Sequence, residues 1–175
     1  MSDRLSALHL YNAGTLARDK DTDPEHLERA YSLLSSSTIV DPTLAAGWYS
    51  TSVANGDMGR VAASVAGYRR QLENPIGTAP GDLTLEYKAK GLCNMGRELY
   101  RMGLMVEALD AVNHAIEIDP RSAPAFCTLS MIQSIRGDKS GAIQHARLAF
   151  QLEPSNPAIE VQLAFALMHA GEYAE

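Results

Sequence analysis

The stretch AIEIDP at residues 115–120 returns as AFQLEP at residues 149–154, 34 positions further along the chain. Both stretches alternate apolar residues with acidic or amide residues and end in proline. Gly103, Gly137 and Gly171 recur at the same interval. Because self-similarity at a fixed period of this length is the signature of a repeat architecture, the sequence predicts an array of one repeated unit.

Each unit is expected to be a pair of helices. Apolar or small residues recur at spacings of three and four over residues 92–99 and again over residues 105–116, as on one face of an α-helix. Glycine tolerates positive φ, so the recurring glycines suit a chain reversal between two helices. Pro120 and Pro154 prevent the second helix of each pair from continuing. The sequence therefore predicts antiparallel helix pairs.

This unit resembles the tetratricopeptide repeat, a 34-residue helix-turn-helix with large and small residues at fixed positions. The third and fourth units carry the resemblance, although Gln133 and Ala146 depart from it. The matching residues are Leu92, Met95, Gly96, Leu99, Ala108, Val112, Pro120, Phe126, Leu129, Ser130, Ala142 and Pro154. The resemblance implies an all-α fold, a right-handed solenoid of antiparallel helix pairs whose first helices line a concave groove.

The same register extends over the rest of the chain. Trp48 follows Pro42 by six residues, as Phe126 follows Pro120. The expected single array, residues 1–175, has units at about 3–42, 43–76, 82–121 and 122–155 and a truncated unit at 156–175. Asp82 is expected to cap an unusually long first helix of the third unit. We expect helices at residues 3–18, 24–38, 43–56, 58–73, 82–102, 105–118, 122–136, 139–152 and 156–170.

Composition disfavours several classes of function. Fifteen Lys and Arg against 21 Asp and Glu give the 175 residues a net charge of −6, which disfavours binding to nucleic acids and to anionic membranes. Two cysteines are too few for the disulfide framework of a small secreted domain. The N-terminus does not read as a signal peptide, and no apolar run is long enough to cross a bilayer. We expect a cytoplasmic protein.

Signatures of catalysis or of metal binding are weak. Asp19, Asp21 and Asp23 resemble the start of a calcium loop, but Pro24 and Ala30 stand where that loop needs its glycine and its closing carboxylate. The acidic run therefore predicts a surface loop. We expect no catalytic residue, cofactor or metal site within these residues, and hence no enzyme activity of their own.

The groove is the expected binding site for a partner protein or peptide. Its candidate residues lie on the first helices of the units: Tyr11, Asn12, Tyr49, Lys90, Asn94, Arg97, Arg101, Cys127, Met131 and Phe165. Lys90, Arg97 and Arg101 gather like charges about one helical turn apart, and Glu98 is expected to face elsewhere. This pattern favours a partner that carries acidic groups.

Two functions remain open. The array is a protein–protein interaction scaffold, or it is the N-terminal substrate-selecting module of a larger enzyme, such as a protein glycosyltransferase. The resemblance implies the second function through Asn12 and Asn94, which occupy the slot that asparagines fill in arrays of that family. The sequence after Glu175 would separate the two.

The fifth unit is expected to leave an apolar stripe uncovered. Ile159, Leu163, Leu167 and Met168 recur with helical spacing, and Glu175 ends the sequence before a second helix can cover them. The stripe predicts self-association through residues 159–170.

Overall fold

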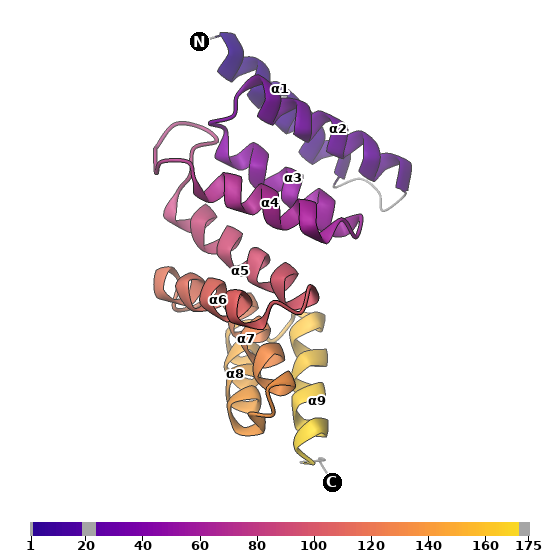
Figure 1. The fold of residues 1–175 in the computed structure, drawn as a ribbon, viewed down its shortest axis with the longest axis vertical. Coiled ribbons are helices and arrows are strands. Elements are labelled where there is room, and N and C mark those ends of the chain that lie inside the picture. Colours follow the sequence, from indigo (N-terminus) through magenta and orange to yellow (C-terminus); the bar gives the residue numbers. More distant parts are fainter. Residues whose placement is uncertain (1, 19–23, 172–175) are drawn as a thin grey trace.

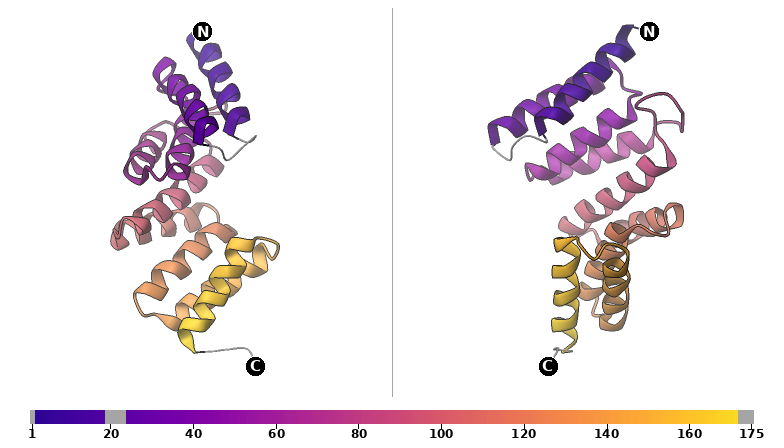
Figure 2. Two further views of the ribbon diagram at one scale, coloured as in Figure 1. Left: turned by 90° about the vertical axis from the view of Figure 1, so that its right-hand side faces the viewer. Right: turned by 180° about the vertical axis from the view of Figure 1, so that it is seen from behind.

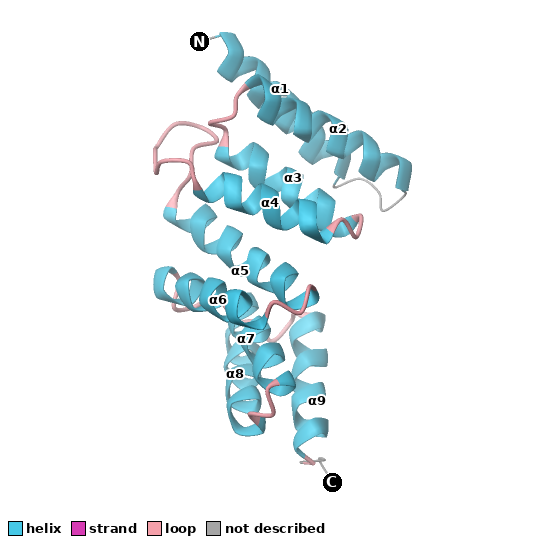
Figure 3. Cartoon of the chain, viewed as in Figure 1, coloured by secondary structure: helices cyan, strands magenta, loops and turns pink. Residues whose placement is uncertain are grey.

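The computed structural model describes residues 2–18 and 24–171, and these residues form an array of helices (Figures 1 and 3). These described residues contain no β-strand, so the all-α prediction is confirmed. The helices are α1 (Ser2–Arg18), α2 (Pro24–Val40), α3 (Ala45–Asp57), α4 (Val61–Leu72), α5 (Leu85–Arg101), α6 (Met105–Ile118), α7 (Ala123–Ile135), α8 (Lys139–Leu152) and α9 (Pro157–Ala170).

The helices pack as antiparallel pairs that turn progressively along the array. The first pairs lie across the long axis, whereas α7, α8 and α9 run nearly along it (Figures 1 and 2). Each odd-numbered helix contacts the next odd-numbered helix, whereas the described even-numbered helices do not contact one another. The odd-numbered helices therefore form the tighter, inner row of a solenoid.

Glycines form the turns between paired helices. Gly59, Gly103, Gly137 and Gly171 all have positive φ, between 73° and 81°, at the ends of odd-numbered helices. This backbone conformation is easily adopted by glycine alone. The largest buried cluster lies between α5, α6 and α7.

One helix start differs from the prediction. Thr84 caps α5, because its side chain accepts a hydrogen bond of 3.2 Å from the backbone N–H of Tyr87. Asp82 does not cap the helix; it accepts a hydrogen bond from the backbone N–H of Ala79 and pairs with Arg4. The carboxylate of Asp82 is thus used by the preceding loop, and the helix begins three residues later than expected.

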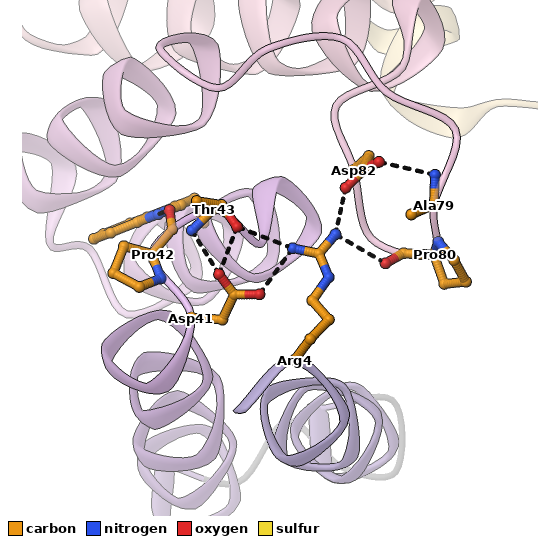
Figure 4. A network of polar contacts seen from close by, with 8 residues as sticks. Arg4, Asp41, Pro42, Thr43, Ala79, Pro80 and Asp82 are labelled. Atoms are coloured by element: carbon orange, nitrogen blue, oxygen red, sulfur yellow. Dashed lines mark hydrogen bonds and ion pairs between the residues drawn. The ribbon is translucent and has the colours of Figure 1, made fainter. Parts of the chain in front are cut away.

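Arg4 connects the start of α1 to the turn between α2 and α3 and to the loop between α4 and α5 (Figure 4). Its guanidinium donates to Asp41 at 2.9 Å and to Thr43 at 3.2 Å, between α2 and α3. It also donates to Asp82 and to the carbonyl of Pro80, in the loop between α4 and α5. This network holds the longest loop of the described chain against the first two units.

Arg4→Ala is expected to lower the free energy of unfolding by about 1–2 kcal/mol near neutral pH, because it removes several charge-assisted hydrogen bonds at a partly buried site. Burial alone would raise the pKa of Asp41, but hydrogen bonds from Thr43 and Arg4 outweigh it and hold that pKa below its ordinary value of 3.8. A depressed folded-state pKa stabilises the fold above the ordinary value, and this stabilisation is lost as the pH falls below it.

Urea unfolding of wild type and Arg4→Ala at pH 7 and in acid checks this expectation, and the difference should shrink in acid. Arg70→Ala is the control. Both side chains of its ion pair with Glu73 are exposed to solvent, so losing this pair should lower the free energy of unfolding by no more than about 0.5 kcal/mol. If Arg4→Ala and Arg70→Ala lowered the free energy of unfolding equally, the special role of Arg4 would be contradicted.

Candidate functional site

The candidate residues all lie on the inner row of helices. Tyr11 and Asn12 are on α1 and Tyr49 is on α3. Helix α5 carries the cations and Asn94, while α7 and α9 carry Cys127, Met131 and Phe165. The inner row on which the groove is expected therefore runs along α1, α3, α5, α7 and α9, and its two halves differ in chemistry.

The N-terminal half is occupied by tyrosines from four helices. The ring of Tyr49 makes edge contacts with Tyr68 at 6.0 Å and with Tyr87 at 5.5 Å between centroids. The side-chain amide of Asn94 donates a hydrogen bond of 3.2 Å to the hydroxyl of Tyr49. Tyr11 is hydrogen-bonded to Tyr87. These five residues, the tyrosine cluster, largely satisfy one another's polar groups.

Two members of the tyrosine cluster were not among the predicted site residues. Tyr68 comes from the even-numbered helix α4, and Tyr87 comes from the first turn of α5. Burial raises the pKa of Tyr68 far above its usual range. Burial, together with the hydrogen bond to Tyr87, also raises the pKa of Tyr11. Both phenols are therefore neutral at physiological pH and act only through hydrogen bonding and ring contact.

The expected position of Glu98 is wrong. Its side chain is only 3% exposed and accepts a hydrogen bond of 2.6 Å from Arg101, while the Nε of Arg97 lies 3.7 Å away. A carboxylate under two guanidiniums offsets most of their mutual repulsion. The third cation is also paired, since Lys90 lies 2.5 Å from Glu86 in the exposed first turn of α5. The hydrogen bond from Lys90 lowers the pKa of Glu86.

The two candidate cysteines of the inner row are free thiols with raised pKa values. Cys93 is buried and Cys127 is half-buried. Burial raises the pKa of Cys93 to about 11 and also raises that of Cys127, although the charge of Arg97 acts in the opposite direction on both. Since the thiolate is the reactive form, these side chains serve as small apolar groups.

The C-terminal half of the groove exposes large apolar side chains. We call Met131, Ile135, Val161, Phe165 and Met168 the apolar patch; Met131 is half-buried and the other four are exposed. Helix α9 packs on α7 through Gln162, which donates a hydrogen bond of 3.1 Å to Ser130. It packs on α8 through Leu163 and Leu167. The exposed members of the patch lie on the sides of α7 and α9 that these contacts leave uncovered.

This packing also corrects the expected stripe of the fifth unit. Ile159 is buried in a cluster with Ala123, Phe126 and Ala149, while Leu163 and Leu167 are partly buried against α8. Only Met168 of the four predicted residues is largely exposed. The stripe is mostly buried within the array. Most of the apolar surface on which the expected self-association rested is therefore already covered by other helices.

Other kinds of site find no support in the part of the chain that the structure describes. It contains no group of three metal-ligating side chains and no helix that could span a membrane. The acidic run at residues 19–23 lies outside the described residues.

No protein-family model matches the chain, and no curated protein matches it significantly. Several solved structures match the chain in fold. The match to the APC/C hetero-tetramer Cut9–Hcn1 has 15% identity and a TM-score of 0.79, and covers 96% of this chain but 31% of that chain. PilF of Pseudomonas aeruginosa shares 17% identity, with 99% and 72% of the two chains covered and a TM-score of 0.76.

A third structure, YrrB, is described as a tetratricopeptide-repeat protein with an unusual peptide-binding site. It is 13% identical, covering 95% of this chain and 78% of that one, with a TM-score of 0.67. At these identities the likeness concerns the fold. The predicted resemblance is confirmed at that level: the chain folds as a tetratricopeptide-repeat solenoid.

Proposed function

We propose that this tetratricopeptide-repeat solenoid binds a segment of a partner protein in the groove of its odd-numbered helices and acts as a scaffold. The apolar patch carries the proposal. Large apolar side chains on a concave surface are typical of sites that bind other proteins. The peptide-binding description of YrrB, a protein of the same fold, agrees with this use of the solenoid.

A scaffold role also fits the chemistry of the ionisable groups. The buried phenol of Tyr68 and both thiols are held in their neutral forms. Lys90 and Arg101 of α5 lie beside carboxylates of the same helix. None of these groups is poised as a nucleophile or as a general base near neutral pH.

The alternative, a substrate-selecting module of a larger enzyme, would use the same groove. It receives less support from the asparagines, because the side-chain amide of Asn94 is engaged by Tyr49. Asn12 is exposed on α1, at the far end of the array. These two side chains therefore do not form a continuous ladder along the groove.

The proposal is tested with random peptides of about 12 residues displayed on phage and selected on the full chain. Affinities of the enriched peptides are then compared for Asn12→Arg and Phe165→Asp, at the two ends of the groove, and for Ile39→Asp on α2. Ile39 is 78% exposed on an even-numbered helix and is the control.

We expect at least one groove variant to weaken binding about tenfold or more, because each would place a new charge in the interface. Ile39→Asp should leave the affinity within about twofold. Binding that is lost in Ile39→Asp and kept in both groove variants would overturn the proposal, as would the absence of any enriched peptide.

A further inference from the structure

The two halves of the groove leave different groups available to a ligand. In the N-terminal half, the residues of the tyrosine cluster join α1, α3 and α5 through ring contacts and a hydrogen bond. Asn94 donates its amide hydrogen to this cluster. A ligand would have to break these contacts to bind there.

The C-terminal half has fewer internal contacts: within the described residues, the ring contact of Phe165 is with His169 of its own helix, 4.2 Å away between centroids. Val161 is 68% exposed and Phe165 is 44% exposed, although the opposite side of α9 is already buried through Ile159 and Ala166. Helix α9 is thus apolar on two faces, which is typical of a helix that is covered on both sides. Only one of these faces is covered within the described chain.

Arg97 lies where the two halves meet. Its positive charge acts on Tyr68 from α4, on Cys93 of α5 and on Cys127 of α7. The carboxylate of Glu98 bonds to Arg101 at 2.6 Å, and only the Nε of Arg97 approaches it, at 3.7 Å. Within the described residues, the terminal guanidinium nitrogens of Arg97 therefore have no hydrogen-bond partner, and the side chain is about half exposed.

The charges around this point do not satisfy Arg97 from elsewhere. Two guanidiniums share the single carboxylate of Glu98, and Asp119, whose charge acts on Cys93 and Lys90, forms no ion pair with Arg97. Helix α7 contains no charged residue, and Glu160 is the only acidic residue of α9. An arginine with free terminal N–H groups matches a carboxylate in a two-pronged hydrogen-bonding geometry.

Resting on the proposed function, we infer that the partner is an amphipathic peptide segment bound over α5, α7 and α9. Its large apolar side chains cover the apolar patch, and one carboxylate of the segment bonds to Arg97. A run of acidic residues is not required, because Lys90 and Arg101 already have carboxylate partners. The N-terminal half of the groove supports this site and does not contact the segment.

Peptides enriched on the full chain by phage display provide the probe. Val161→Asp tests the apolar patch, and Val106→Asp is its matched control. Val106 is 75% exposed on α6 and also lies in the first turns of its helix. Met168→Asp is a second patch variant, and circular dichroism verifies that each variant keeps its helicity. Arg97→Gln tests the carboxylate contact, with Arg69→Gln, an exposed arginine of α4, as control.

We expect the enriched peptides to combine large apolar residues with one Asp or Glu. Val161→Asp and Met168→Asp should each weaken their binding about tenfold or more, while Val106→Asp should change it by less than about twofold. Replacing the peptide's acid by its amide should weaken binding about tenfold to wild type and hardly at all to Arg97→Gln, because the contact is then already lost. Arg69→Gln should still discriminate between acid and amide.

Several outcomes would overturn this assignment. Binding that Asn12→Arg abolishes and that Val161→Asp and Arg97→Gln leave intact would place the segment on the N-terminal half, and the proposed groove function would then survive alone. Binding that no groove variant affects would remove both proposals. Enrichment of uniformly acidic peptides would exclude the apolar contact. Self-association that Val161→Asp abolishes, without peptide binding, would assign the patch to a second copy of the chain.

Discussion

Ile132→Ala is expected to lower the free energy of unfolding by about 2–5 kcal/mol. Ile132 is fully buried in α7, in the cluster that joins α5, α6 and α7. Truncation removes buried methyl and methylene groups and leaves a cavity that neighbouring helices fill only in part. Because each unit of a solenoid contacts only its neighbours, the loss weakens the junction between the third and fourth units.

Ile135→Ala on the same helix is the matched control. Ile135 is 59% exposed, so its truncation should change the free energy of unfolding by no more than about 0.5 kcal/mol. Urea unfolding followed by circular dichroism measures both variants. In the peptide assay, by contrast, Ile135→Ala should lower the free energy of peptide binding by more than it lowers the free energy of unfolding. A large stability loss at Ile135 would mean that α7 is rotated from the position described above.

Much of the fold could be predicted from the sequence because the signals are local. The glycines at the ends of odd-numbered helices need positive φ, and the prolines stop the even-numbered ones, so the turns can be assigned without knowing the tertiary structure. The predicted and observed bounds of α6 and α8 agree at both ends. Helix α5 differed because Asp82 and Thr84 compete for the cap, and Arg4, distant in the sequence, favours the loop conformation of Asp82.

The candidate site was harder to predict, because its character depends on contacts between distant segments. Tyr87 reaches the groove only because α5 is longer at its start than the repeat requires, and Tyr68 belongs to an even-numbered helix. A glutamate beside two arginines usually lies in solvent, so the burial of Glu98 could not be inferred from its type. Its spacing of three residues from Arg101 was the available signal.

The apolar patch shows a related difficulty. Phe165 and Met131 could be assigned to the groove because they occupy the same slot of successive repeats, 34 residues apart. Which apolar residues of α9 remain exposed depends on how α9 sits against α7 and α8. Helical spacing alone selected Ile159 and Leu163, which pack inward.

Helices α5 and α6 approach each other closely at Gly96. A Cβ atom at this position would lie 2.6 Å from the Cγ2 of Val112 and 3.1 Å from the backbone carbonyl oxygen of Ala108. The first contact is with a fully buried side chain, and the second is with the backbone of the partner helix α6. Neither atom can move away without separating the two helices, so the missing side chain of Gly96 sets the spacing of the pair.

Gly96→Leu is therefore expected to destabilise the protein by about 2–3 kcal/mol, because the added side chain forces α5 and α6 apart. The better helix propensity of leucine offsets only about 1 kcal/mol of this cost. Ala63→Leu, at an exposed position of α4, is the control and should be within about 0.5 kcal/mol of wild type.

The physical cause can be verified with a double-mutant cycle, measured by urea unfolding. Val112→Ala opens space beside position 96, so the double variant should be more stable than the sum of the two single losses predicts, by about 0.5–3 kcal/mol. Strictly additive losses would show that the added side chain meets something other than Val112. A neutral Gly96→Leu would show that α5 and α6 lie further apart than this structure places them, and the spacing of the groove helices would have to be revised with it.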